Sequence, residues 1–244
     1  MPEKAPRRTK REPEATWPLR EAPTGALAKK PRPTARGRRT EAALLDAARR
    51  VIARDGFRAA SIAAICEEAG TSLGTFYTYF DSKERVLERL ALAFKDEVQA
   101  RYADVPSEGK SPYELMHALV RIYYEAFREH SPVLAGLLHA SMHDPSIAAF
   151  WRTLRADARR QIAANVRYMQ ERGYAPGLDP EATASALGAM MDYFSYVWLV
   201  EGGEDGRPTI PDRLAVETMA RIWFHSVCFR EEDVPELSKK RGRR

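Results

Sequence analysis

The chain has 244 residues, 44% of them apolar, which is enough to bury a sizeable core in one or two domains. It contains no uncharged apolar run long enough to cross a membrane, and no apolar segment typical of a secretory signal follows its charged N-terminus. Its two cysteines, Cys66 and Cys228, are too few for a disulfide-stabilised secreted protein. We therefore expect a cytoplasmic protein with reduced thiols and no membrane span, a redox switch being the alternative for the cysteines.

The net charge of +5 is unevenly distributed along the chain. Residues 1–39 carry a net charge of +8 and the last six residues carry +5, so that residues 40–238 carry −8. Basic tails beside an acidic folded body are typical of proteins that add non-specific affinity for nucleic-acid phosphates. Tails that only improve solubility are the alternative interpretation.

The first segment, residues 1–37, holds seven of the sixteen prolines and few large apolar side chains. Such a segment cannot bury enough apolar surface to offset the entropy of ordering, so we predict a disordered basic arm. From Arg38 onward the apolar residues recur at helical spacing. The pattern predicts four helices in the first half: 40–54, ending at Gly56; 61–69, capped by Ser61; 73–80, capped by Ser72; and one from about Ser82 to Ala103, where Asp81 and Glu84 resemble a capping box.

The second half is predicted to hold five more helices, each with a proline in its first turn, where proline is tolerated. Their ranges are 112–129, 132–142, 145–173, 180–200 and 211–230. Ser111, Ser131, Asp144 and Asp179 precede four of these prolines, as N-cap residues do. The expected fold is therefore all-α with about nine helices, followed by a basic tail at 231–244.

Residues 61–80 have the pattern of a helix, a tight turn and a second helix, a unit whose second helix can enter the DNA major groove. Gly70 permits the turn, and Gly74 allows the second helix to approach DNA closely. Thr75, Tyr77 and Tyr79 are predicted to face outward, where a tyrosine hydroxyl can reach a phosphate or a base edge. Lys83 suits a phosphate, and the helix starts at Ser61 and Ser72 offer backbone N–H groups to phosphate oxygens.

Residues 39–90 resemble the DNA-binding domain of the TetR family of transcription regulators, through TEAALLDAARRVIARDGF, SIAAICEEAGTSLGTFYTYF and DSKERVL. The resemblance implies DNA contacts by the positions Ser61, Ser72, Gly74, Thr75, Tyr77, Tyr79 and Lys83. Many members place a long polar residue early in the second helix, where this chain has Ala63 and Ala64. We therefore hypothesise that the basic arm adds contacts in the adjacent minor groove.

The second half resembles the EthR-like branch of the same family, through YYEAFREHSPV, FWRTL, ALGAMMDYFSYVWLVEGGE and RLAVETMARIWFHSV. The resemblance implies an apolar tunnel for a hydrophobic small molecule such as a fatty acyl compound, lined by Met116, Tyr123, Phe127, Trp151, Gly188, Met191, Tyr196 and Trp223. Arg155 lies one helical turn after Trp151 and could meet an anionic head group, a solvated surface arginine being the alternative. Relatives carry asparagine as polar anchors where this chain has Gly188 and Met191, which makes the tunnel more apolar.

The last two helices are expected to pack against their symmetry mates as a four-helix bundle, and the resemblance supports a homodimer. The dimer positions predicted are Ala184, Leu187, Gly188, Met191, Leu214, Thr218 and Ile222. The chain would then consist of the arm at 1–37, a helix-turn-helix domain at 38–85, a ligand-binding and dimerisation domain at 86–230 and the tail. We expect a repressor that leaves a palindromic operator when its effector tilts the fourth helix, with no cofactor and no metal.

Two other functions fit parts of the sequence. His139 and His143 are one helical turn apart, as in zinc hydrolases, but Ala140 stands where the general base would be and no third ligand is evident. The segment Gly70–Gly74 matches the nucleophile elbow of hydrolases literally, but it lies between two helices. A second alternative is a sequence-independent DNA-binding protein whose basic tails supply the affinity. Neither alternative accounts for the helix-turn-helix pattern, so we expect a regulator and no enzymatic activity.

Overall fold

A computed structural model describes residues 34–106, 108–205 and 209–230. In these ranges the chain forms nine helices and no strand, which confirms the predicted all-α fold. The helices are α1 (Ala35–Ala59), α2 (Ile62–Glu68), α3 (Leu73–Tyr79), α4 (Lys83–Ala103), α5 (Pro112–Glu129), α6 (Ser131–Ser141), α7 (Pro145–Gln170), α8 (Pro180–Leu199) and α9 (Asp212–Val227). The predicted basic tail at 231–244 lies outside the described residues, as does the predicted arm up to residue 33.

The predicted caps explain most of the helix starts. Ser111, Asp144 and Asp179 each accept a backbone N–H from the first turn of α5, α7 and α8. The predicted cap at Ser131 is wrong, because this residue is already helical and its hydroxyl donates to the carbonyl of Arg128. The capping box predicted at Asp81 is also wrong: Ser82 caps α4.

The first helix begins earlier than its apolar pattern predicts. The side chain of Thr34 accepts a hydrogen bond from the N–H of Gly37, which caps a polar turn that periodicity alone does not reveal. Residues 35–37, predicted to belong to the disordered arm, are therefore helical. Gly56 has a φ of 75°, which only glycine adopts freely, and it turns the chain near the end of α1 as predicted.

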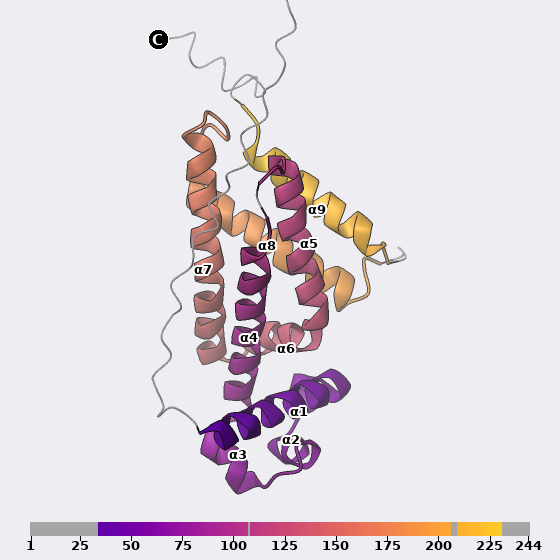
Figure 1. The fold of residues 1–244 in the computed structure, drawn as a ribbon. Coiled ribbons are helices and arrows are strands. Elements are labelled where there is room, and N and C mark those ends of the chain that lie inside the picture. The colour runs from indigo at the N-terminus through magenta and orange to yellow at the C-terminus, as the bar shows by residue number, and fades with distance from the viewer. Residues whose placement is uncertain (1–33, 107, 206–208, 231–244) are drawn as a thin grey trace, which may run out of the picture.

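Helices α1 to α3 form one end of an elongated molecule, and α4 leads from them into the bundle of α5 to α9 (Figure 1). One continuous cluster of buried residues joins the two parts. It contains Leu44 of α1, Ile65 of α2 and Phe76 of α3, together with Leu137 of α6 and Leu154 of α7. The helix-turn-helix end is thus packed directly on the bundle, and a displacement of α6 or α7 must disturb it.

Among the described residues, none of the helices is long and apolar enough to span a membrane.

Candidate DNA-binding surface and ligand cavity

Helices α2 and α3 form the predicted helix-turn-helix pair. The backbone turns at Gly70, whose φ is 63°, and the hydroxyls of Ser61 and Ser72 cap the two helices by accepting the N–H of Ala64 and Thr75. Phe76 is fully buried and anchors α3 to α1 and α4 through the shared core. The predicted contact residues therefore stand on a helix whose inner side is fixed by packing.

The outer side of α3 presents a small exposed surface. Gly74 is exposed, and a Cβ added there would meet no atom closer than 3.8 Å, so the backbone can approach a partner closely. Tyr77 is 54% exposed and its ring meets Phe76 edge to face. Thr75 and Tyr79 are half-buried, and Tyr79 also packs against the core. Among the large side chains predicted to contact DNA (Tyr77, Tyr79 and Lys83), Tyr77 is thus the exposed one.

Lys83 has a structural role that the sequence analysis missed. Its ammonium group donates hydrogen bonds to the carbonyls of Phe57, Arg58 and Ala60 at 3.0 to 3.2 Å. It also lies 4.9 Å from the centre of the Phe57 ring. All three N–H donors are used, so a phosphate contact by Lys83 requires the loss of one of these bonds.

We expect the substitution Lys83→Met to destabilise the protein by about 2 kcal/mol, because three carbonyls at the end of α1 lose a charged donor. Thermal unfolding measures the structural role of Lys83, and the salt dependence of DNA binding measures its contact with phosphate. An unchanged melting temperature, with a salt slope reduced by about one phosphate contact, would instead assign Lys83 to DNA alone.

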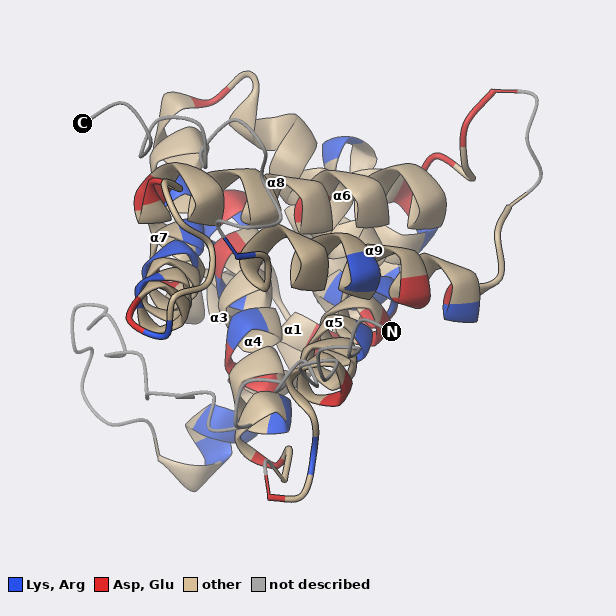
Figure 2. Cartoon of the chain, turned by 90° about the horizontal axis from the view of Figure 1, so that it is seen from above, with Lys and Arg blue, Asp and Glu red and all other residues tan. Residues whose placement is uncertain are grey.

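Basic residues also stand at the start of α1. Arg36, Arg38 and Arg39 lie in its first turns and are exposed. The start of α1 is blue at the lower left of Figure 2. This end of α1 therefore offers positive charge to a backbone phosphate.

A cavity of about 540 Å³ lies in the bundle between α4, α5, α7, α8 and α9. Six of the nine predicted ligand-pocket residues line it: Met116, Tyr123, Arg155, Gly188, Met191 and Trp223. This volume lies within the range of about 300 to 1,000 Å³ typical of small-molecule sites. The structure therefore gathers residues from distant parts of the chain around one space of suitable size.

A second, smaller cavity of about 180 Å³ holds the other three predicted residues, Phe127, Trp151 and Tyr196. Leu134 and Leu138 of α6 also line it. Of all the lining residues, Arg155 and Asp192 alone line both cavities, so their side chains form the shared wall.

Polar contacts hold this wall together. Arg155 Nε lies 2.8 Å from Asp192 Oδ2, and the Tyr123 hydroxyl donates to Asp192 Oδ1 at 2.5 Å. Burial raises the pKa of Asp192, and the hydrogen bonds and charge of Tyr123 and Arg155 oppose that rise. The pKa of Tyr123 is raised well above its usual value by burial and by the neighbouring carboxylate. Arg155 is therefore neither an isolated surface arginine nor an unoccupied anion site.

Several polar residues of the larger cavity were not predicted, among them Asp192 and Asn165. Asp192 was not predicted because sequence does not show which face of α8 it occupies. Asn165 of α7 is 6% exposed, and its side-chain oxygen has no hydrogen-bond partner among the described residues. Together with other polar lining residues, such as Lys95, Asp96 and Gln99 of α4, they give the cavity polar groups that Gly188 and Met191 do not provide.

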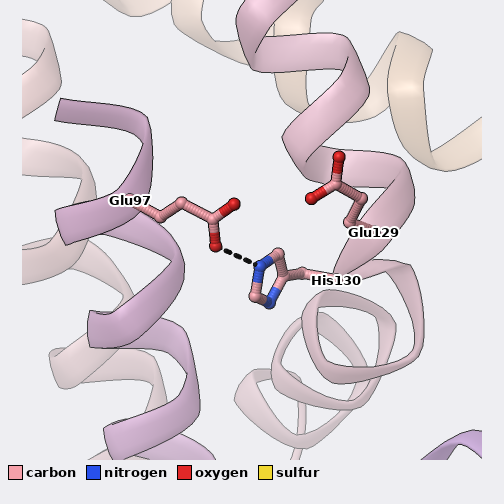
Figure 3. A group of neighbouring side chains, drawn as sticks. All are labelled: Glu97, Glu129 and His130. Carbon is pink, nitrogen blue, oxygen red and sulfur yellow. Dashed lines mark hydrogen bonds and ion pairs between the residues drawn. The ribbon is translucent and has the colours of Figure 1, made fainter. Parts of the chain in front are cut away.

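Two of the histidines, His130 and His139, make side-chain hydrogen bonds. His139 Nε2 is 2.7 Å from the Tyr196 hydroxyl, so its neighbour is a cavity residue. His130 lies with Glu97 and Glu129 (Figure 3), and its Nε2 is 2.8 Å from Glu97 Oε2. Arg101 pairs with both carboxylates, which supplies a cation to this group and joins α4 to α5.

The predicted dimer residues divide into two sets. On α9, Leu214 is 50% and Ile222 48% exposed, and Thr218 lies between them, half-buried. On α8, Ala184, Leu187 and Met191 are buried inside the protomer and Gly188 lines the larger cavity, so this part of the prediction is wrong. The exposed stripe on α8 consists instead of Ala182, Ala186, Ala189 and Tyr193. Most of the α8 ribbon is uncharged (Figure 2).

Comparisons with known proteins agree with this architecture. Residues 44–90 match the family described as bacterial regulatory proteins, tetR family, and residues 116–228 match the C-terminal domain of the transcriptional regulator EthR. The chain belongs to the TetR family. Its second half is of the EthR-like type, and members of the family are DNA-binding transcription regulators, not enzymes.

Individual relatives of this TetR-family chain cover most of its length. The regulator EthR of Mycolicibacterium smegmatis is 27% identical over 210 residues, which is 80% of this chain and 92% of that protein. UidR of Escherichia coli K12 is 29% identical over 150 residues, which is 61% of this chain and 76% of that protein. A regulator from Saccharomonospora viridis, solved with choline, has the same fold, with a TM-score of 0.64 and 22% identity over 79% of this chain and all of that one.

Proposed function

We propose that this protein is a homodimeric repressor that binds a palindromic operator through α3 and is released by a hydrophobic small molecule bound in the cavity of its bundle. The observation that carries the proposal is the coexistence of an exposed, rigidly mounted recognition helix and a cavity lined by six predicted ligand residues. The same packed core connects the two sites.

The DNA side of the proposal rests on the outer face of α3. Exposed Tyr77 and the open backbone at Gly74 suit close contact with a groove, while Phe76 holds the helix in place. Ala63 is exposed on α2 and offers no polar group, so base recognition falls mainly to α3. The arginines at the start of α1 would lie near the phosphates.

The effector side rests on two connections between the cavity and the helix-turn-helix end. Helix α4 lines the larger cavity through Lys95 and Tyr102 and begins directly after α3. Helix α6 lines the smaller cavity and packs against α1 more extensively than α4 does. An occupant that displaces either helix changes the position of α3. Operator affinity then falls by the coupling free energy, typically about 1–3 kcal/mol.

The dimer rests on the exposed apolar stripes of the last two helices. The small side chains of Ala182, Ala186 and Ala189 allow a partner helix to approach α8 closely, and Leu214 and Ile222 extend the stripe onto α9. A twofold dimer would place two copies of α3 about one helical turn of DNA apart.

We expect Tyr77→Ala to lower operator affinity by about ten- to a hundredfold per half-site, because a contact to a base edge or phosphate is lost. The thermal stability should remain unchanged, since the side chain is exposed. The operator is first isolated by selecting genomic DNA fragments on the full chain in moderate salt, and affinity is then measured by fluorescence anisotropy. Tyr77→Phe separates the contribution of the hydroxyl from that of the ring.

The matched control for this selection removes the N-terminal arm and leaves α1 intact. The repressor function is supported if the native protein recovers a few fragments that share a palindrome, if Tyr77→Ala fails to recover them, and if the protein without the arm still recovers them. Uniform recovery that survives Tyr77→Ala and disappears with the arm would assign DNA binding to the basic segment and overturn the role of α3.

A further inference from the structure

Asn165 of α7 is a buried amide whose hydrogen-bonding capacity the folded chain leaves unused. Its side chain lines the larger cavity, the residue is 6% exposed, and its Oδ1 has no hydrogen-bond partner among the described residues. An unpaired polar group in the interior destabilises a folded protein, and most buried polar groups are paired for this reason. The exception at Asn165 therefore calls for a partner, and the adjoining cavity is the space that can hold one.

The positively charged lining residues of α7 lie far from Asn165. Arg155 and Arg159 precede it by ten and six residues, which corresponds to about 15 and 9 Å along the helix axis. The lining residues one helical turn before Asn165 are Gln161 and Ile162, which carry no charge. The surface of α7 that lines the cavity therefore becomes uncharged towards the buried amide.

The charged lining residues of the other helices lie at the same end of the cavity as these arginines. On α4, Lys95 pairs with Asp157 of α7. On α8, Asp192 pairs with Arg155. Asp96 follows Lys95 directly and is exposed. A charged ligand group beside the buried amide would find no ion-pair partner among these residues, so the group that reaches the amide is uncharged.

The amide of Asn165 selects ligand groups by what they can donate. Its oxygen accepts hydrogen bonds and its nitrogen donates them, and rotation about the Cβ–Cγ bond brings either one to the cavity. A hydroxyl or amide group of a ligand can donate to the oxygen and can also accept from the nitrogen. Carboxylates, esters and thioesters carry only acceptors, so they leave the oxygen unpaired.

We propose that Asn165 is the polar anchor of the effector and that the effector is an uncharged, mainly apolar molecule with a hydroxyl or amide group. This inference rests on the proposed effector function and adds the chemical class of the ligand. The apolar part of the ligand lies against Met116, Leu119 and Trp223, which line the same cavity. An apolar cavity of about 150 Å³ holds one benzene molecule, so a cavity of about 540 Å³ takes roughly twenty non-hydrogen atoms.

Straight-chain compounds of similar length test this preference, because they differ mainly in their polar group. Decanamide and 1-decanol carry a donor, methyl nonanoate carries acceptors only, and decanoate adds a charge. Isothermal titration calorimetry on the full-length protein gives the dissociation constant of each compound, and fluorescence anisotropy gives its effect on operator affinity. Asn165→Leu removes the amide at a similar side-chain volume. Gln99→Leu is the matched control, since it also replaces an amide by an apolar side chain at a lining position of α4.

In the native protein we expect decanamide and 1-decanol to bind at least as tightly as methyl nonanoate and to release DNA, although their polar groups cost more to remove from water. Decanoate should bind most weakly. In Asn165→Leu, the affinity for decanamide relative to that for methyl nonanoate should fall about tenfold, because the donor of the ligand loses its acceptor. Gln99→Leu should keep the native preference.

The same preference in the native protein and in Asn165→Leu would overturn the anchor while leaving the effector site intact. Weaker binding of both donor compounds than of methyl nonanoate by the native protein would do the same, and this comparison needs no variant. Tighter binding of decanoate than of decanamide would place an anionic head group at the charged end of the cavity instead. Failure of all these compounds to bind, or binding with no loss of operator affinity, would contradict the effector function itself.

Discussion

The double substitution Leu214→Arg/Ile222→Arg should convert the protein to a monomer and weaken operator binding by about a hundredfold or more. Both side chains are about half exposed on α9, so the folded protomer does not depend on them. In the proposed dimer they are buried, where two unpaired arginines on each protomer would oppose association. A monomer binds one half-site and loses the effective concentration that links two half-sites, which is typically worth about 10² to 10⁴ in affinity.

Sedimentation equilibrium measures the association, and anisotropy with the isolated operator measures the affinity. Met142→Arg is the matched control, since Met142 is an exposed apolar residue at the end of α6 and lies outside the two stripes. Its thermal stability, mass and operator affinity should match those of the native protein. A double variant that remains dimeric would place the interface elsewhere. One that becomes monomeric and still binds the operator at full strength would contradict two-half-site recognition.

Most of the fold could be predicted because the helix boundaries depend on residues that are close together in the sequence. Prolines and their preceding caps defined the starts of α5, α7 and α8 within a residue. The prediction of the start of α1 failed because residues 35–37 contain no large apolar side chain that would mark them as helical. A hydrogen bond from the N–H of Gly37 to the side chain of Thr34 caps this additional turn. The predicted division into domains at residue 85 did not reveal that one core contains both Phe76 and Leu137, because contacts between residues far apart in the chain leave no pattern in the sequence spacing.

The candidate site was predicted in part, and most errors concern which face of a helix a residue occupies. All nine predicted ligand residues line at least one of the two cavities, but sequence could not show that there are two cavities or that Arg155 and Asp192 border both. On α8, the predicted dimer positions lie on the wrong face of the helix. Alanine, glycine and leucine are apolar on both sides of this helix, so its pattern gives no unique face. Lys83 was assigned to phosphate because the carbonyls it binds are more than twenty residues earlier.

The bundle and the helix-turn-helix end approach each other closely at Gly136 of α6. A Cβ added to this glycine would lie 2.7 Å from Cβ of Phe57 in the last turn of α1. That distance is shorter than any real contact of this kind, and no rotamer change of Phe57 moves its Cβ. Gly136→Ala must therefore push α6 away from α1. We expect a net loss of about 1–3 kcal/mol in stability from overpacking.

The same displacement should lower operator affinity by about tenfold without any change at the DNA surface, because α1 carries the core on which α3 stands. Gly188→Ala is the matched control, since it is also a glycine within a helix, and its added Cβ would meet only a nitrogen of Arg155 at 4.0 Å. This substitution should stabilise the protein by up to about 1 kcal/mol through helix propensity and leave operator affinity unchanged. Equal operator affinity in the two variants would show that the contact between α6 and α1 does not position α3. A loss confined to Gly136→Ala would instead identify that contact as the route by which an occupant of the bundle reaches DNA.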